Sequence, residues 1–183
     1  MLAQDRRIAK ERGYGIRCVE ASMDQMPMLD PASFDIVFQP VSTCYVPDVG
    51  AVYREVARVL RPNGSYVSQH KQPINMQSSA LPSPQGDVVV EPYYRTGPLP
   101  PIVGEFEHRE NGAMEFLHRW DQLLGEMLRS GFVLEDLYEP RHGNRLAKPG
   151  SFAHRSATVP PYVMFKARRR AEINLESRQI LLS

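Results

Sequence analysis

The chain has little cysteine, no long apolar run and no excess of charge of either sign. Two cysteines, Cys18 and Cys44, cannot form a disulfide framework, which favours a reducing compartment. No apolar run approaches the roughly 18 to 20 residues that span a bilayer. The 22 Lys and Arg nearly balance the 21 Asp and Glu, which argues against a dedicated nucleic-acid binder. Residues 1–12 contain no apolar h-region, so we expect no secretory signal, no membrane partner and a cytoplasmic location.

Proline is the one residue type in excess, at 16 of 183. Seven prolines fall between Lys71 and Gly104, where no periodic pattern survives apart from Val88–Val90, a possible edge strand. A segment this long without regular structure is usually a functional loop or a disordered one. Its aromatic residues could pack against the rest of the domain, so we interpret 72–104 as a lid or insertion in one domain spanning 1–167.

The remaining segments alternate between strand and helix patterns. Val49, Val52, Val56 and Val59 form one apolar stripe after the N-cap residue Asp48. The pattern predicts the following further elements: a helix over 1–12, strands over 16–20, 34–38 and 65–70, a helix over 115–129, strands over 132–138 and 162–166, and a solvated basic tail over 168–183. The prediction is an α/β fold with an antiparallel pair at its end.

Several of these segments also carry motifs of a known family. The motif-bearing segments are Asp24-Gln25-Met26-Pro27-Met28, Ser33-Phe34-Asp35-Ile36-Val37, Val46-Pro47-Asp48, and Glu55 through Gly64. In order and spacing they resemble the class I S-adenosylmethionine-dependent methyltransferases, in particular the methyltransferase type 11 domain. The resemblance implies a partial Rossmann-like sheet with the equivalents of strands 3, 4, 5, 6 and 7. It also implies S-adenosylmethionine as cofactor and methyl transfer to a small-molecule acceptor.

Two features of that family are missing from this sequence. It has no glycine-rich turn after a first strand, where glycines let the backbone approach the cofactor, and no acidic residue for the ribose hydroxyls. We hypothesise that Met1 is a misplaced start and that a strand-helix-strand piece precedes it. Otherwise we expect poor solubility, a rearranged sheet, or pairing with a second chain, including a homo-oligomer. The alternative function is a non-catalytic binding or scaffold protein that acts with a partner chain.

The resemblance assigns cofactor contacts to five residues at two strand ends. Ser22 and Met23 stand where the family holds the adenine, although they could simply form a turn. Gln39 ends an otherwise apolar strand, beside the expected methionine portion of the cofactor, and Pro40 and Val41 follow it. Ligands of open α/β sheets bind at this carboxyl edge.

Two further residues are candidates for catalysis. Tyr45 stands where the family often lines the acceptor pocket, and an exposed tyrosine without a role is an equal alternative. His118 could act as a base, since histidine titrates near neutral pH, or it could be structural. His70 and Lys71 end a strand at the same carboxyl edge and could instead be solvated loop residues. No spacing fits a metal site or a serine nucleophile elbow, so we predict neither.

Overall fold

The computed structural model describes residues 2–79, 86–102 and 108–171, and it has an α/β fold as expected. Its centre is a four-stranded sheet with the order β1-β2-β4-β3. The strands are β1 (Phe34–Pro40), β2 (Leu60–Lys71), β3 (Phe132–Tyr138) and β4 (Tyr162–Arg169). β1 and β2 are parallel, whereas β4 runs antiparallel to both β2 and β3. The predicted antiparallel pair at the end of the domain is confirmed.

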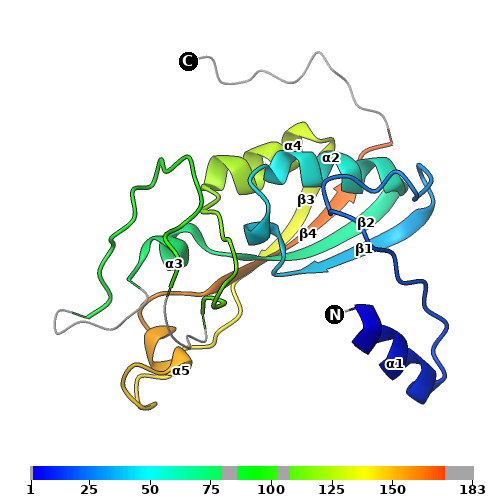
Figure 1. Cartoon of the computed structure of the whole chain (residues 1–183). Coiled ribbons are helices and arrows are strands. Elements are labelled where there is room, and N and C mark those ends of the chain that lie inside the picture. Colours follow the sequence, from blue (N-terminus) through cyan, green and yellow to red (C-terminus); the bar gives the residue numbers. More distant parts are fainter. Residues whose placement is uncertain (1, 80–85, 103–107, 172–183) are drawn as a thin grey trace, which may run out of the picture.

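One face of the sheet is covered by helices. α2 (Val49–Val59) begins at the predicted N-cap, where the Asp48 carboxylate accepts a hydrogen bond from the Ala51 N–H at 3.2 Å. The π-helical turn η2 (Asp121–Gly125) continues into α4 (Glu126–Arg129), and both lie beside α2 over the sheet (Figure 1). The shorter elements are α1 (Leu2–Arg12), η1 (Thr43–Tyr45), α3 (Pro73–Gln77) and α5 (Phe152–Arg155).

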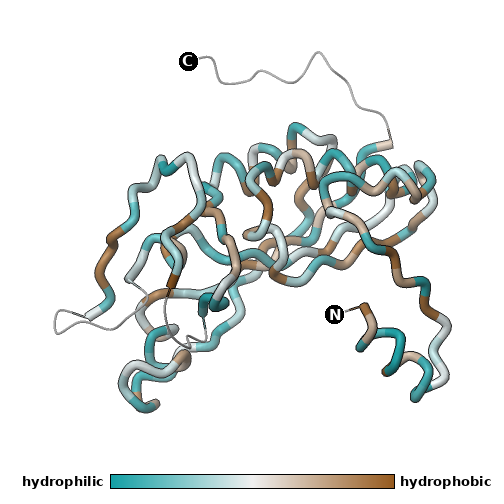
Figure 2. The backbone as a smooth tube through the Cα atoms, in the orientation of Figure 1, coloured by the Kyte–Doolittle hydropathy of each residue, from teal (hydrophilic) through white to brown (hydrophobic). Residues whose placement is uncertain are grey.

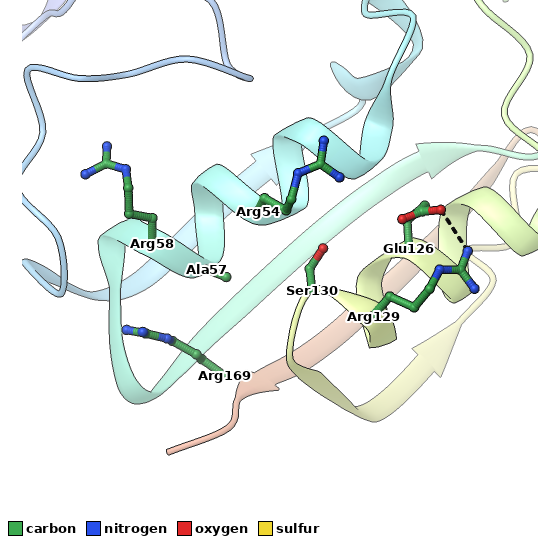
Figure 3. A pocket seen from close by; sticks show the side chains of 7 residues that line it. All are labelled: Arg54, Ala57, Arg58, Glu126, Arg129, Ser130 and Arg169. Carbon is green, nitrogen blue, oxygen red and sulfur yellow. Dashed lines mark hydrogen bonds and ion pairs between the residues drawn. The ribbon is translucent and has the colours of Figure 1, made fainter. Parts of the chain in front are cut away.

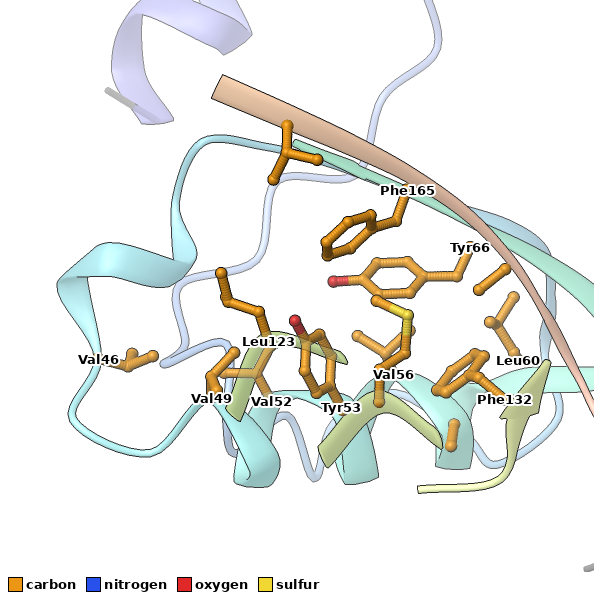
Figure 4. Close-up of a cluster of buried hydrophobic side chains, with 14 residues drawn as sticks. Val46, Val49, Val52, Tyr53, Val56, Leu60, Tyr66, Leu123, Phe132 and Phe165 are labelled. Carbon is orange, nitrogen blue, oxygen red and sulfur yellow. The ribbon is translucent and has the colours of Figure 1, made fainter. Parts of the chain in front are cut away.

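The main core lies between these helices and the sheet (Figure 4). Alternation along β2 turns Tyr66, Ser68 and His70 inward, as the two-residue period of a strand requires. The Tyr66 ring meets Tyr53 of α2 edge to face, with centroids 6.1 Å apart, and lies 5.5 Å from Phe132. The valine stripe of α2 fills the space beside them, so periodicity in the sequence identified this half of the core.

The opposite face of the sheet exposes apolar side chains. Ile36 and Phe38 of β1 are 66% and 65% exposed. Their register partners Ser65 and Val67 place them on the face away from α2, and β1 is the terminal strand of the sheet. α1 is largely hydrophilic, lies apart from the sheet and buries only Ala9 (Figure 2). The apolar run of β1 is typical of a strand covered on both faces, and here one face is open.

A predicted strand and a predicted helix differ from the structure. Residues 16–20 form no strand, so the prediction of a strand 3 equivalent at this position is wrong. This short segment has no neighbouring strand to bond with, and a strand is stable only in a sheet. The predicted helix over 115–129 begins only at Trp120, because the Phe116 N–H bonds to the Cys44 carbonyl at 2.7 Å and holds the preceding residues extended.

The proline-rich segment packs against the domain at several points. It contains α3, and Val88–Val90 forms a single bridge to Ser78 instead of a strand. The Trp120 N–H donates to the Tyr93 hydroxyl at 3.3 Å. A lid function for 72–104 stays a prediction, and residues 80–85 and 103–107 lie outside the described residues.

β4 continues to Arg169, past its predicted end, and takes in the first residues of the predicted tail. The tail beyond it, residues 172–183, lies outside the described residues. Within the described ranges, no helix combines the length and apolar character that a membrane crossing demands.

Candidate cofactor and acceptor site

The turn that follows β1 has a strained backbone. Val41 adopts a φ of +40°, in the left-handed region. A β-branched residue is a genuine outlier there, and such strain persists only where surrounding contacts enforce it. Here the Val41 N–H donates to the Gln69 carbonyl of β2 at 2.9 Å. The strain lies at the carboxyl edge of two parallel strands, where the sequence predicts the cofactor.

Gln39 is buried at this edge and its amide is fully engaged by the protein. Its Oε1 accepts from the Tyr66 hydroxyl, and its Nε2 donates to the Ser42 Oγ and the Met23 sulfur, both at 3.1 Å. The structure thus brings together two residues predicted to bind cofactor, Gln39 and Met23. Because its polar atoms are already bonded, Gln39 is suited to position the turn around a ligand.

The other two predicted cofactor residues lie on the surface nearby. Ser22 is exposed and donates its hydroxyl to the Asp24 carboxylate, next to a bridge between Ser22 and Gln25. Pro40 is exposed as the last residue of β1. Neither is held by the core, so both are accessible to a ligand at this edge.

η1 follows the strained turn and is held by two buried histidines. The Thr43 hydroxyl hydrogen-bonds to His70 Nδ1 at 2.8 Å, and His70 Nε2 reaches the Ser68 hydroxyl at 2.8 Å. His118 Nε2 donates to the Thr43 carbonyl at 3.0 Å. The expectation that His70 is a solvated loop residue is wrong, since it is fully buried on β2.

Burial keeps both histidines neutral. Burial, with a smaller contribution from nearby His118, lowers the pKa of His70 to about 3, and burial also lowers the pKa of His118. His118 lies behind η1, 5% exposed, with its donor used by the protein. This placement suits a positioning residue for η1 better than a base that meets an acceptor.

Tyr45, the last residue of η1, lines a cavity of about 340 Å³. The cavity opens beside the carboxyl ends of β1 and β2 and is lined by Val41, Tyr45, Lys71, His108, Arg109, Glu110 and Tyr162. The Tyr45 hydroxyl donates to Glu110 Oε2 at 2.9 Å. Burial and this hydrogen bond raise the pKa of Tyr45, so it stays a protonated donor.

Two residues of the cavity lining, Lys71 and Arg109, belong to a buried ionic cluster that the sequence did not predict. The Glu115 carboxylate, fully buried, bonds to Lys71 Nζ and, at 2.6 Å, to Arg109 Nε. Lys71 also donates to the His108 carbonyl at 3.0 Å. Lys71 is therefore buried, and its interpretation as a solvated residue is wrong. One indication of this cluster was present in the sequence, the place of Lys71 at the end of a predicted strand. Glu115 gave none, because it fell in a predicted helix.

The described residues contain no group of three His, Cys, Asp or Glu side chains that could hold a metal ion. Burial raises the pKa of the Cys44 thiol to about 11, so this cysteine is a protonated core residue and not a nucleophile.

The chain is similar to known proteins in sequence and in fold. The family described as "Methyltransferase domain" matches residues 1–68. The uncharacterized methyltransferase YbaJ of Bacillus subtilis is 31% identical over 145 residues, which are 78% of this chain and 57% of YbaJ. The chain therefore spans little more than half the length of that relative.

Solved structures share the fold at lower sequence identity. An S-adenosylmethionine-dependent methyltransferase from Mesorhizobium loti has a TM-score of 0.65 at 22% identity, covering 90% of this chain and 77% of the other. A second such protein, described as putative, from Listeria monocytogenes has a TM-score of 0.67 at 13% identity, covering 92% and 77%.

The fold, together with the carboxyl edge of β1 and β2, is that of a class I methyltransferase-like α/β domain. The family match over residues 1–68 and the relative YbaJ make the chain similar to the class I S-adenosylmethionine-dependent methyltransferases. S-adenosylmethionine is the cofactor of that family. The residues present fit one side of its site, since the strained turn at Val41 and the hydrogen-bonded amide of Gln39 lie at the edge where the cofactor is predicted. The glycine turn that the family uses has no counterpart in this sequence.

Proposed function

We propose that this chain acts in methyl transfer to a small-molecule acceptor, with cofactor and acceptor meeting at the carboxyl edge of β1 and β2. The observation that carries the proposal is the cavity at this edge, lined by Tyr45 and by Val41 of the turn that follows β1. Its volume of about 340 Å³ lies within the roughly 300 to 1,000 Å³ of small-molecule sites.

The chain's own residues would bind, orient and exclude water. Bound S-adenosylmethionine supplies an electrophilic methyl group. Ser22, Met23, Pro40 and Val41 would contact that cofactor, and Gln39 would hold the turn in place. Tyr45 would donate a hydrogen bond to the acceptor in exchange for its bond to Glu110. Most of the rate gain would come from positioning the acceptor, which is worth several kcal/mol in well-oriented reactions, about 7–11 at best.

A proton released by the acceptor has one suitable recipient in the cavity. Glu110 lines the cavity and accepts a hydrogen bond from Tyr45 at 2.9 Å, so its carboxylate lies next to the hydroxyl that would donate to the acceptor. His118 would act indirectly, by fixing η1 through the Thr43 carbonyl.

The experiment that tests the proposal is calorimetric titration of the folded chain with S-adenosylhomocysteine. We expect saturable binding that Gln39→Leu weakens at least tenfold. Gln77→Leu is the matched control, because Gln77 is also a part-buried amide bonded to the protein, through the Glu91 carbonyl. Circular dichroism must show that each variant is folded.

A second candidate is a non-catalytic protein that pairs with a partner chain. The open edge of β1 with exposed Ile36 and Phe38 favours it. If the folded chain gives no heat of binding with S-adenosylhomocysteine, the enzyme interpretation of this chain fails and the partner interpretation replaces it.

A further inference from the structure

An arginine-rich cavity of about 410 Å³ lies at the other end of the sheet (Figure 3). It opens between α2, α4 and the last residue of β4, Arg169. Arg169 pairs with Phe132, the first residue of β3, and Ala57 and Arg58 come from the end of α2, just before β2 begins. The cavity is therefore near the amino ends of β2 and β3, away from the carboxyl edge with Val41 and Tyr45.

The cavity has a positive lining. Arg54, Arg58, Arg129 and Arg169 line it, with Glu126 as the only acidic residue among its lining residues. Three of these arginines have a carboxylate partner: Arg54 pairs with Asp48, Arg58 with Glu55 and Arg129 with Glu126. Within the described part of the chain, no carboxylate pairs with Arg169.

Arg169 is held in place but keeps an unused donor. Its Nη1 donates to the Leu60 carbonyl, which fixes the guanidinium at the cavity. Its Nε is buried and has no hydrogen-bond partner within the described residues. A buried donor of a charged group without an acceptor is costly, and a ligand that draws the guanidinium toward the cavity would relieve this cost. The Ser130 hydroxyl, between α4 and β3, lines the same space (Figure 3).

We propose that this cavity binds the phosphate group of a small molecule, with Arg169 as the anchor. Arginine is the side chain best suited to tetrahedral oxyanions, since its planar fork offers parallel donors. Arg129 and Arg54, both about half exposed or more at the rim, add positive charge, and Ser130 adds a neutral donor. Glu126 opposes the anion, so its carboxylate limits the affinity. This site is independent of the proposed methyl transfer.

The test is calorimetric titration of the full chain with inorganic phosphate and with pyrophosphate, each against sodium chloride at matched ionic strength. We expect saturable binding of at least one probe that Arg169→Gln weakens tenfold or more and Arg129→Gln weakens threefold or more. Glu126→Gln removes the opposing charge and is expected to tighten binding at least twofold.

Arg61→Gln is the matched control, because Arg61 lies at the same end of the sheet, pairs with Asp35 and is outside the cavity. It is expected to leave binding within twofold of the wild type. If Arg169→Gln does not fold, Arg129→Gln and Glu126→Gln still show whether the cavity binds the anion. Binding that is absent, or that all three substitutions of arginine weaken equally, would overturn the proposal.

Discussion

Among the single residues of the proposed site, one valine adopts a backbone conformation that valine rarely takes. Val41 occupies the left-handed region, which costs an L-residue about 1–2 kcal/mol relative to glycine. Its hydrogen bond to Gln69 ties this turn to β2. A conformational cost of this size is typical of sites where the backbone geometry serves binding and not stability, which agrees with the proposed cofactor edge.

This strain can be measured with two substitutions at the same position. Both Val41→Gly and Val41→Ala remove the branched side chain, but only glycine tolerates the positive φ. We expect the glycine variant to be more stable than the alanine variant by about 1 kcal/mol in urea unfolding. Equal stability of the two variants would show that the turn is not strained.

The ionic cluster at the cavity predicts a large loss of stability. Glu115→Leu would leave Lys71 and Arg109 buried without their counterion, at a cost of about 3–5 kcal/mol. Adding Lys71→Met should recover part of that loss, because one uncompensated charge disappears. Chemical denaturation of both single variants and the double variant checks this. Strict additivity would contradict the coupling.

The buried histidine of β2 predicts acid lability. The pKa of His70 is lowered to about 3 by burial, so below its unfolded pKa of about 6.5 only the unfolded chain takes up this proton. The free energy of unfolding should therefore fall as the pH drops from 6.5. His70→Gln should reduce this slope by about 1.4 kcal/mol per pH unit, whatever it costs at pH 7. A slope unchanged by the substitution would rule out His70 as the source.

At the scale of elements, the open edge of β1 is the least protected part of the molecule. An exposed apolar edge strand pairs readily with other chains. We expect Ile36→Lys with Phe38→Lys to reduce self-association in sedimentation velocity. Folding stability should change little, because both side chains are mostly exposed. Leu146→Lys, at a 95% exposed site off the sheet, is the control. Self-association that persists in the double variant would place the contact elsewhere.

Elements with a strong period of apolar residues could be predicted from the sequence. Elements that depend on hydrogen bonds to distant segments could not. The valine stripe and the Asp48 N-cap were sufficient to predict α2. The pattern of 16–20 resembled a strand as closely as that of β1 did, but only β1 has a neighbour to bond with. Likewise, the apolar spacing from Glu115 predicted helix, and the bond from Phe116 to Cys44 overrode it.

At the scale of the whole molecule, the sheet is covered by helices on one face and exposes apolar side chains on the other. Motif order was enough to predict the class of fold and the edge at which Gln39 and Met23 meet. It could not predict the Lys71, Arg109 and Glu115 cluster or the cavity, because these join segments that lie far apart in the sequence. The chain spans 57% of the length of YbaJ.

The central claim is that the carboxyl edge of β1 and β2 holds S-adenosylmethionine. Photocrosslinking of the radiolabelled cofactor to the folded chain, followed by peptide mapping, tests this claim most directly. We predict label in the peptides that contain residues 22–45, and its loss when excess S-adenosylhomocysteine competes. Label that is absent, or that lies only in other peptides and resists competition, would contradict the account.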